Sequence, residues 1–420
     1  MTPILHLAFK SLLNRRFTAL LTLISIALSV TLLLGVERIR TEARNSFAAT
    51  LSGTDLIVGA RSGPVQLLLY AVFRIGDATN NVSWQSYQTF AQDPKVAWTI
   101  PISLGDSHRG YRVLGTDADY FTHYRYGDDR PLTLDAGRPF TDVYDAVLGA
   151  EVAEALGYGL GQEIVLSHGA GPSGTSFVDH ADKPFRVAGI LQRTGTPVDR
   201  TVHVSLAGIE AIHLGWRGGA AGSSISAEEA RQRDLTPKTI TAFLVGLHSK
   251  TGVFHVQRAV NDYRREPLLA ILPGVALDQL WGLVGVAEQA LLAVSGFVVV
   301  VGLFGLLTAL LTGLDERRRE MAILRSVGAR PAHIFALIAG EAAFLTLLGA
   351  LLGVAALYAT LFLGQPLIEG RLGLFIPVGH PGAHELALLG AVIVAGLVAG
   401  LLSALRAYRY SLADGLSVRV

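Results

Sequence analysis

Residues 17–36 read FTALLTLISIALSVTLLLGV, a stretch of twenty residues that contains no charged side chain. Its polar groups are the hydroxyls of Ser and Thr, which can hydrogen-bond back to the carbonyls of their own helix. A hydrocarbon core about 30 Å thick is crossed by about 20 apolar residues in a helix that rises 1.5 Å per residue. The stretch therefore predicts a membrane-spanning helix, and this prediction decides the class of fold.

The composition of the chain agrees with insertion into a membrane. Of 420 residues, 50% are hydrophobic and only 16% are charged, and the mean hydropathy is +0.43. A typical soluble domain has about 25% charged residues. The net charge of +1 argues against a nucleic-acid partner, and the absence of cysteine excludes disulfides, thiolate zinc sites and thiol nucleophiles.

Three further apolar stretches of spanning length follow in the last third of the sequence. They predict transmembrane helices at residues 284–314, which begin with an extracytoplasmic stalk, at 331–363 and at 386–406. A secretory signal peptide is the alternative for the first stretch, because Lys10, Arg15 and Arg16 precede it. That stretch is longer than the apolar region of a signal peptide, which has about 7–15 residues, and no A-x-A cleavage site follows it. We therefore favour a membrane span that is retained in the protein.

The long interval at residues 37–283 has the character of a water-exposed domain. Short apolar runs separated by Gly, Pro and Asp predict strands, and runs with a period of three to four residues predict helices. We therefore expect an α-helical membrane protein with four transmembrane helices (1 + 3) and a large mixed α/β extracytoplasmic domain, in two subdomains, between helices 1 and 2. The predicted strands are Arg109–Gly115, Glu163–Ser167, Phe185–Leu191, Thr201–Ser205 and Thr239–Leu247, and the predicted helices are Ser83–Gln92, Gly149–Leu156 and Gly252–Arg265.

Basic residues near the ends of the spans predict the orientation of the chain. They gather in three short segments: 1–16, which forms an amphipathic helix in this interpretation, the turn at 315–330, and the tail at 407–420. An excess of Lys and Arg in short loops marks the cytoplasmic side. The domain at 37–283 and the loop at 364–385 are then expected outside.

The turn between the second and third spans reads DERRREMAILRSVGARP over residues 315–331. Good helix formers fill it up to Val327, Gly328 can end the helix in a left-handed conformation, and Pro331 can start the next helix. The segment predicts a short cytoplasmic helix. It is either a stop signal for translocation or a docking surface for a cytoplasmic protein.

Two pairs of glycines four residues apart lie in the last two spans: Gly349 with Gly353, and Gly396 with Gly400. Small residues at this spacing allow close approach of helices in a membrane. Such contacts can form within one protomer or across a dimer, and we favour packing within the protomer.

The loop at residues 167–182 carries the candidate metal ligands His168, His180 and Asp182. Imidazole and carboxylate groups together can bind zinc or another divalent ion. Their spacing matches no fixed metal motif, so a solvated hairpin is the alternative. No G-x-S-x-G or H-E-x-x-H motif occurs, and none of the five lysines follows a glycine, so neither a catalytic residue nor a phosphate-binding loop is expected in this chain.

The segment 316–329, ERRREMAILRSVGA, resembles the conserved cytoplasmic segment of a known family. This family comprises the permease subunits of the macrolide-exporter (MacB), lipoprotein-release (LolC/LolE) and cell-division FtsX group of ABC systems. Weaker matches in the outer domain are similar to the MacB-like periplasmic core domain. They are VLGTDADYF at 113–121, AGRPF at 136–140, LGYGLGQ at 156–162 and FRVAGIL at 185–191.

The resemblance implies a permease without enzyme activity of its own, in the bacterial inner membrane with its large domain in the periplasm. The implied partners are a cytoplasmic ABC ATPase, which would bind ATP and Mg²⁺ in place of any cofactor on this chain, a second permease copy in a homodimer, and a periplasmic binding or adaptor protein. ATP hydrolysis would drive periplasmic motion, by mechanotransmission, for export or extraction of a substrate. The implied ATPase-coupling residues are Glu316, Arg317, Glu320, Met321, Leu324, Arg325 and Gly328.

Two alternatives to this function remain open at the level of sequence. One is an FtsX-like regulatory membrane protein that controls a periplasmic partner such as a cell-wall hydrolase. The other is the permease of a metal or metallophore system, which would use the histidines of the loop at 167–182.

Overall fold

The computed structural model describes residues 16–50, 52–169, 178–214, 216–217, 220–221, 225–316, 321, 323, 325–326, 328–372 and 379–409. The chain divides into two compact units. We call the unit formed by residues up to Ala43 and most residues from Gly285 onward the helical unit. The unit Arg44–Val284 is called the α/β domain.

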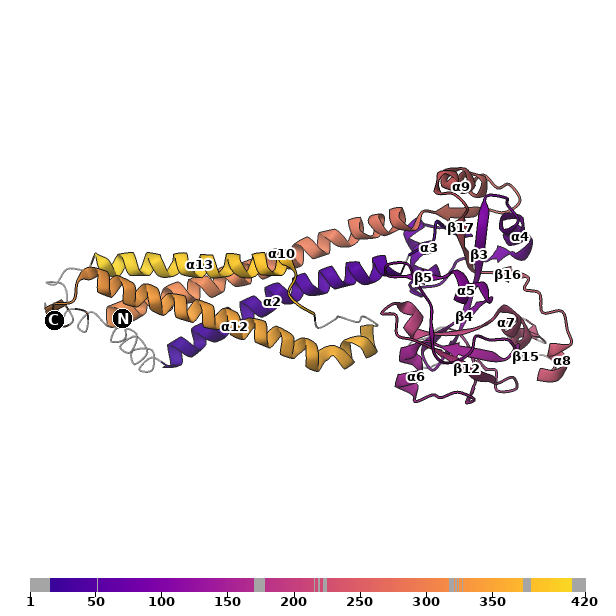
Figure 1. Ribbon diagram of the computed structural model, residues 1–420, viewed down its shortest axis with the longest axis horizontal. Coiled ribbons are helices and arrows are strands. Elements are labelled where there is room, and N and C mark those ends of the chain that lie inside the picture. Colours follow the sequence, from indigo (N-terminus) through magenta and orange to yellow (C-terminus); the bar gives the residue numbers. More distant parts are fainter. Residues whose placement is uncertain are drawn as a thin grey trace. The chain divides into compact units, whose positions relative to one another are not determined.

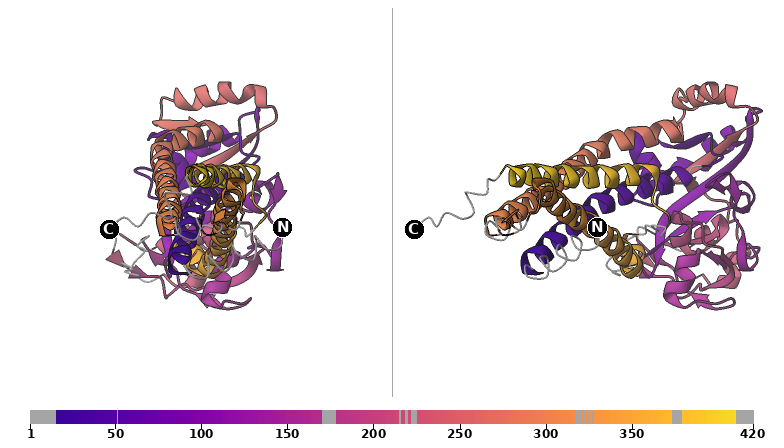
Figure 2. Two further views of the ribbon diagram at one scale, coloured as in Figure 1. Left: turned by 90° about the vertical axis from the view of Figure 1, so that its left-hand side faces the viewer. Right: turned by 60° about the vertical axis from the view of Figure 1, so that its left-hand side comes forward.

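Among the described residues, four long helices build the helical unit (Figures 1 and 2), and each is long and apolar enough to cross a membrane. The predicted order of one span, a large domain and three spans is confirmed. Proline begins α10 and α12, as its fixed φ angle and missing N–H favour at the first position of a helix. The helices are α2 (Arg16–Ala49), α10 (Pro273–Glu316), α12 (Pro331–Leu372) and α13 (Ala383–Tyr408).

The paired glycines lie at close contacts between these helices. A Cβ atom added to Gly349 would lie 2.8 Å from Cβ of Ile26 on α2, and one added to Gly400 would lie 2.2 Å from Cβ of Ala342 on α12. Both distances are shorter than a van der Waals contact, so a side chain at either position would force the helices apart. Gly353 meets α2 and Gly396 meets α12 in the same way, all within one protomer.

The α/β domain is built on one large sheet whose main strands follow the order β18-β1-β17-β3-β4-β13-β8-β12-β7. The pairs β4·β13 and β8·β12 are parallel, and the other pairs on this path are antiparallel. These strands are β18 (Leu268–Ile271), β1 (Leu56–Ala60), β17 (Ala242–Leu247), β3 (Val96–His108), β4 (Tyr111–Thr116), β13 (Thr201–Ser205), β8 (Asp145–Leu148), β12 (Phe185–Leu191) and β7 (Leu134–Gly137).

Strand β3 joins the two halves of the domain. Its first half pairs with β17 and its second half with β4, so both halves share one sheet. Shorter elements surround this sheet. They are α3 (Pro64–Ala71), α4 (Trp84–Ala91), α5 (Asp119–His123), α6 (Ala150–Leu156), α7 (Leu206–His213), α8 (Ala227–Arg231), α9 (Val253–Asn261), β2 (Val82–Ser83), β5 (Arg125–Tyr126), β6 (Arg130–Pro131), β9 (Glu163–Ile164), β10 (Ser167–His168), β11 (Val178–Asp179), β14 (Trp216–Arg217), β15 (Ala220–Ala221), β16 (Thr239–Ile240), η1 (Pro197–Arg200) and η2 (Lys250–Gly252).

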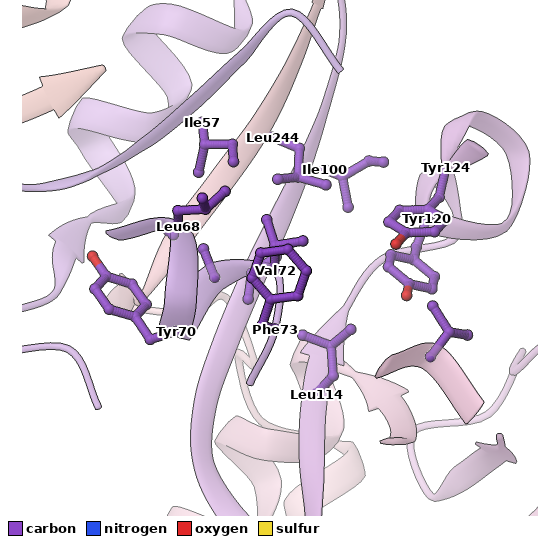
Figure 3. Packing of buried hydrophobic residues seen from close by; sticks show 14 of the residues in the cluster. Ile57, Leu68, Tyr70, Val72, Phe73, Ile100, Leu114, Tyr120, Tyr124 and Leu244 are labelled. Carbon is purple, nitrogen blue, oxygen red and sulfur yellow. The ribbon is translucent and has the colours of Figure 1, made fainter. Parts of the chain in front are cut away.

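The largest core lies between the sheet and α3. Strands β1, β3 and β17 supply Ile57, Ile100 and Leu244, and α3 covers this face with Leu68 (Figure 3). All four side chains are buried, and burial of each contributes about 1.5–3 kcal/mol. This core fixes the half of the sheet in which both chain ends of the domain lie.

The ends of two membrane helices are part of that same core. Phe47, at the end of α2, packs on Phe73 with ring centroids 4.2 Å apart and on Trp281 of α10 at 5.5 Å. Arg44 lies over the Trp281 ring at 5.3 Å. Helices α2 and α10 therefore each contribute one end to the α/β domain and continue as unbroken helices into the membrane segments.

Candidate metal centre and coupling segment

The predicted coupling segment lies in part within the described residues. Arg317, Glu320 and Leu324 fall outside them, and Glu316 is the last residue of α10. Gly328 has a φ angle of 101°, the left-handed conformation that the sequence predicts for the end of the short helix. Its N–H donates to the carbonyl of Arg325 at 3.1 Å, and α12 begins three residues later.

Two large apolar side chains among the described residues of this segment face different surroundings. Met321 is buried against α12 and α13 in a cluster with Ile334, Ile338 and Ala404. Its side chain packs this segment against the helical unit. Ile323 is 52% exposed, so this residue, which sequence reasoning did not single out, offers an apolar contact on the turn.

A buried ion pair, which the sequence analysis missed, ties together the opposite end of the helical unit. Arg38 of α2 donates to Oε2 of Glu385 on α13 at 3.1 Å and to the carbonyl of Gly379 at 3.0 Å. The two charged side chains are only 4% and 11% exposed. Tyr358 of α12 donates to the same Gly379 carbonyl at 2.8 Å. The available signal was the presence of opposite charges just beyond the same ends of two predicted spans.

The register of the sheet brings two metal-ligating side chains together in the α/β domain. His168 of β10 is the direct cross-strand partner of Asp106 on β3. Asp106 lies in a β-bulge, since it and Gly105 together oppose the single residue Val113 of β4. Bulges redirect side chains, and here the carboxylate is almost completely buried, with 2% exposure.

His180 and His213 complete the group from two other elements. The β10–β11 hairpin returns the chain, and the N–H of His180 donates to the carbonyl of Leu166 at 2.9 Å. His213 is the last residue of α7, whose first turn is fixed by Ser205, which accepts from the Gly208 N–H at 2.9 Å. Backbone hydrogen bonds thus set the position of each ligand.

One ligand atom from each of these four residues lies within 4.8 Å of the others. We call Asp106, His168, His180 and His213 the histidine cluster. His168 Nδ1 lies 3.1 Å from Asp106 Oδ1 and 3.4 Å from His213 Nε2, and that Nε2 lies 3.6 Å from the same oxygen. His180 packs edge-on to His213, with ring centroids 5.4 Å apart.

The predicted ligand Asp182 lies elsewhere. Its carboxylate accepts a hydrogen bond from Nζ of the buried Lys183 at 2.9 Å, and it is not part of the histidine cluster. Of the three residues that the loop sequence suggested, the structure brings His168 and His180 together. Asp106 and His213 were missed because they are distant in sequence and no local spacing connects them to the loop.

The protonation of the cluster reflects its burial and its charges. Burial by itself raises the pKa of the Asp106 carboxyl, but the hydrogen bond with His168 and the neighbouring imidazole of His213 outweigh this and lower the pKa to about 2. Burial lowers the pKa of His180. For His213, burial acts to lower the pKa, yet the Asp106 carboxylate raises it above its ordinary value. The group is therefore one buried anion faced by three imidazoles.

Comparison with known families identifies both parts of the chain. Residues 19–260 match the MacB-like periplasmic core domain, and residues 292–412 match the FtsX-like permease C-terminal domain. The macrolide export ATP-binding/permease protein MacB of Nitrobacter winogradskyi is 24% identical over 419 residues, which cover 96% of this chain and 58% of that protein. The MacB protein of Azoarcus sp. is 23% identical over 431 residues, with 96% and 57% covered. The chain thus spans less than two thirds of these relatives.

Two solved structures resemble part of the chain. The periplasmic region of MacB from Actinobacillus actinomycetemcomitans is 12% identical and matches 56% of this chain and 97% of its own, with a TM-score of 0.34. The extracellular domain of the noncanonic ABC-type transporter YknZ from Gram-positive bacteria is 13% identical and matches 52% and 99%, with a TM-score of 0.31. The match to the MacB-like periplasmic core domain covers more than half of this chain, and four of its helices are candidate membrane spans. The chain therefore belongs to the FtsX-like ABC permease family with a MacB-like periplasmic core domain.

Proposed function

We propose that this chain is the permease subunit of an ATP-driven ABC transporter that works by mechanotransmission. In this mechanism a separate cytoplasmic ATPase binds and hydrolyses ATP with Mg²⁺. The permease passes the resulting motion through its membrane helices to the periplasmic α/β domain, which exports or extracts a substrate. The chain itself carries out no chemical step.

The observation that carries this proposal is the continuity of α2 and α10. They contain 34 and 44 residues, which correspond to about 50 Å and 65 Å of helix, against about 30 Å of hydrocarbon core. Both helices end inside the core of the α/β domain, where Phe47 and Trp281 pack together. An unbroken helix changes length very little, so displacement at its membrane end reaches the domain at its other end.

Polar side chains within the spans support motion of helices over passage of a polar substrate. Ser29 donates to the carbonyls of Ser25 and Val298, at 2.8 and 3.2 Å. Thr31 donates to the carbonyls of Ala27 and Gly353, at 2.8 and 2.9 Å. These hydroxyls are used in packing helix on helix, whereas polar groups that form a substrate path face a cavity.

The partners in this proposal follow from the same family. The names of the MacB relatives state that ATP-binding and permease functions are carried by one protein. This chain matches 57–58% of the length of those relatives. Because no lysine of this sequence follows a glycine, we place the nucleotide on a separate ATPase. We further propose a homodimer in the bacterial inner membrane, with a periplasmic binding or adaptor protein as an additional partner.

The coupling role is tested by co-expression with the partner ATPase. Replacing exposed Ile323 with Asp puts a charge in the proposed docking surface, so we expect loss of co-purification or at least a several-fold fall in coupled ATP hydrolysis. Phe254→Asp is the matched control, because Phe254 is 67% exposed on α9 of the α/β domain. Unchanged ATPase coupling in Ile323→Asp would contradict the proposal, and capture of a cell-wall hydrolase in place of a transport partner would favour the regulatory alternative.

A further inference from the structure

We propose that the histidine cluster of the α/β domain, formed by Asp106, His168, His180 and His213, is a binding site for one divalent transition-metal ion, with Zn²⁺ as the preferred ion. The inference is independent of the transport mechanism, because it depends only on side chains within one domain.

The distances between the ligand atoms fit a tetrahedral site. Ligands about 2.0–2.1 Å from zinc lie about 3.3–3.4 Å from one another in a regular tetrahedron. The three edges among Asp106 Oδ1, His168 Nδ1 and His213 Nε2 are 3.1, 3.4 and 3.6 Å. An ion at the centre of this group would reach all three atoms with little side-chain movement, and His180 supplies the fourth atom.

The orientation of His213 is set for binding a cation. Its Nδ1 lies 2.8 Å from the carbonyl oxygen of Ile209, an acceptor, so Nδ1 carries the proton and donates it. In the neutral ring the lone pair is then on Nε2, which points at Asp106 and His168. A backbone carbonyl that fixes the tautomer in this way is a common feature of metal-binding histidines.

Two ligands of the site are buried and two are partly exposed to solvent. Asp106 and His180 are 2% and 1% exposed, whereas the side chains of His168 and His213 are 49% and 30% exposed. A buried carboxylate is stabilised by a nearby cation, and the two exposed imidazoles leave a path for the ion from solvent.

The donor set indicates the kind of metal. Three imidazole nitrogens and one carboxylate oxygen, without thiolate, suit Zn²⁺ and also accept Co²⁺, Ni²⁺ and Cu²⁺. Mg²⁺ and Ca²⁺ prefer sites made of oxygen ligands. We therefore expect the cluster to discriminate strongly against these two abundant ions.

The test uses the full chain, purified in detergent and freed of metal with a chelator. Titration with Zn²⁺ in a calorimeter is expected to show one saturable site per chain, and Co²⁺ is expected to give the intense visible absorption of tetrahedral coordination. Loss of a residue that only orients a ligand costs about 10- to 100-fold in affinity. We expect His168→Ala and Asp106→Asn to cost about 100-fold or more.

Two matched variants serve as controls. Asp182→Asn removes the nearby carboxylate that pairs with Lys183, and His255→Ala removes an exposed histidine of α9; both are expected to bind Zn²⁺ like the unmodified chain. His168 is half-exposed, so His168→Ala is expected to fold even if variants at buried His180 do not, and circular dichroism checks this. Absence of saturable Zn²⁺ binding, a six-coordinate Co²⁺ spectrum, or equal affinity in His168→Ala would overturn the proposal.

Discussion

His203 is a fully buried histidine of β13 in the α/β domain, packed against the ring of Tyr120 with centroids 5.1 Å apart. Its Nδ1 donates to the carbonyl of Val147 at 3.1 Å. Burial, together with the positive charge of Arg74, lowers its pKa to about 3. The ring is therefore neutral in the folded domain throughout the physiological range of pH.

This lowered pKa makes the stability of the domain depend on pH. In the unfolded chain His203 has a pKa of about 6.5, so it binds a proton below that pH while the folded chain does not. The free energy of unfolding therefore falls as the pH decreases toward the pKa of His203 in the folded state. By pH 4 the loss from this residue is about 3 kcal/mol. In His203→Asn, whose amide can still donate to Val147, we expect a flatter fall in melting temperature between pH 7 and 4. Parallel curves for the two proteins would contradict the assignment.

Adding a single methyl group at Gly400 is expected to destabilise the packing of α13 on α12. In Gly400→Ala the new Cβ would lie 2.2 Å from Cβ of Ala342, so α13 and α12 must separate, at a cost of about 1–3 kcal/mol. We expect a lower melting temperature in detergent. Gly390→Ala, on the same helix but with no atom within 4 Å of the added Cβ, is the control and is expected to melt at or above the original temperature.

The buried Arg38–Glu385 ion pair is expected to hold α2 and α13 together. Glu385→Ala leaves the buried Arg38 without its carboxylate, and we expect a loss of about 3–5 kcal/mol. The double variant Arg38→Ala/Glu385→Ala should lose less than the sum of the single changes, as measured by thermal unfolding in detergent. Glu154→Ala breaks the exposed pair with Arg193 and should change stability by less than about 1 kcal/mol.

The bounds of individual strands show how much of the secondary structure local sequence patterns can predict. The predicted strands Phe185–Leu191 and Thr201–Ser205 are confirmed residue for residue as β12 and β13. The predicted strand Thr239–Leu247 is divided into β16 and β17 at Thr241, whose hydroxyl accepts from the Leu104 N–H at 2.9 Å. That contact joins residues far apart in sequence, so no local pattern could indicate it.

Helix ends show the same limit. The predicted helix Gly252–Arg265 ends at Asn261, because the Asn261 side chain accepts from the N–H of Ala270 on β18 at 2.8 Å. Hydropathy predicted the apolar parts of α2 and α10, but both helices extend well beyond them. These extensions are held by packing in the core of the α/β domain, which a hydropathy profile does not report.

The predicted orientation of the chain in the membrane can be tested with single cysteines, because the sequence contains none. Ser249→Cys places a thiol on the surface of the α/β domain, and Ser326→Cys places one on the exposed turn before α12. In spheroplasts, a membrane-impermeant maleimide should label only Ser249→Cys, and both variants should react after lysis. Labelling of both thiols before lysis would contradict the proposed topology.

The four spans, their one-plus-three order and the resemblance to the permease family could be read from the amino-acid sequence, which also predicts the orientation that the labelling experiment tests. These properties depend on the composition of segments of about 20 residues. The free energy of transferring such an apolar segment from water to lipid is larger than the free energy of its contacts with distant residues. By contrast, the grouping of Asp106 and His213 with His168 and His180, and the pairing of Arg38 with Glu385, follow only from the folded structure. Each of these groups unites residues from separate elements, and only strand register and helix packing bring them within reach of one another.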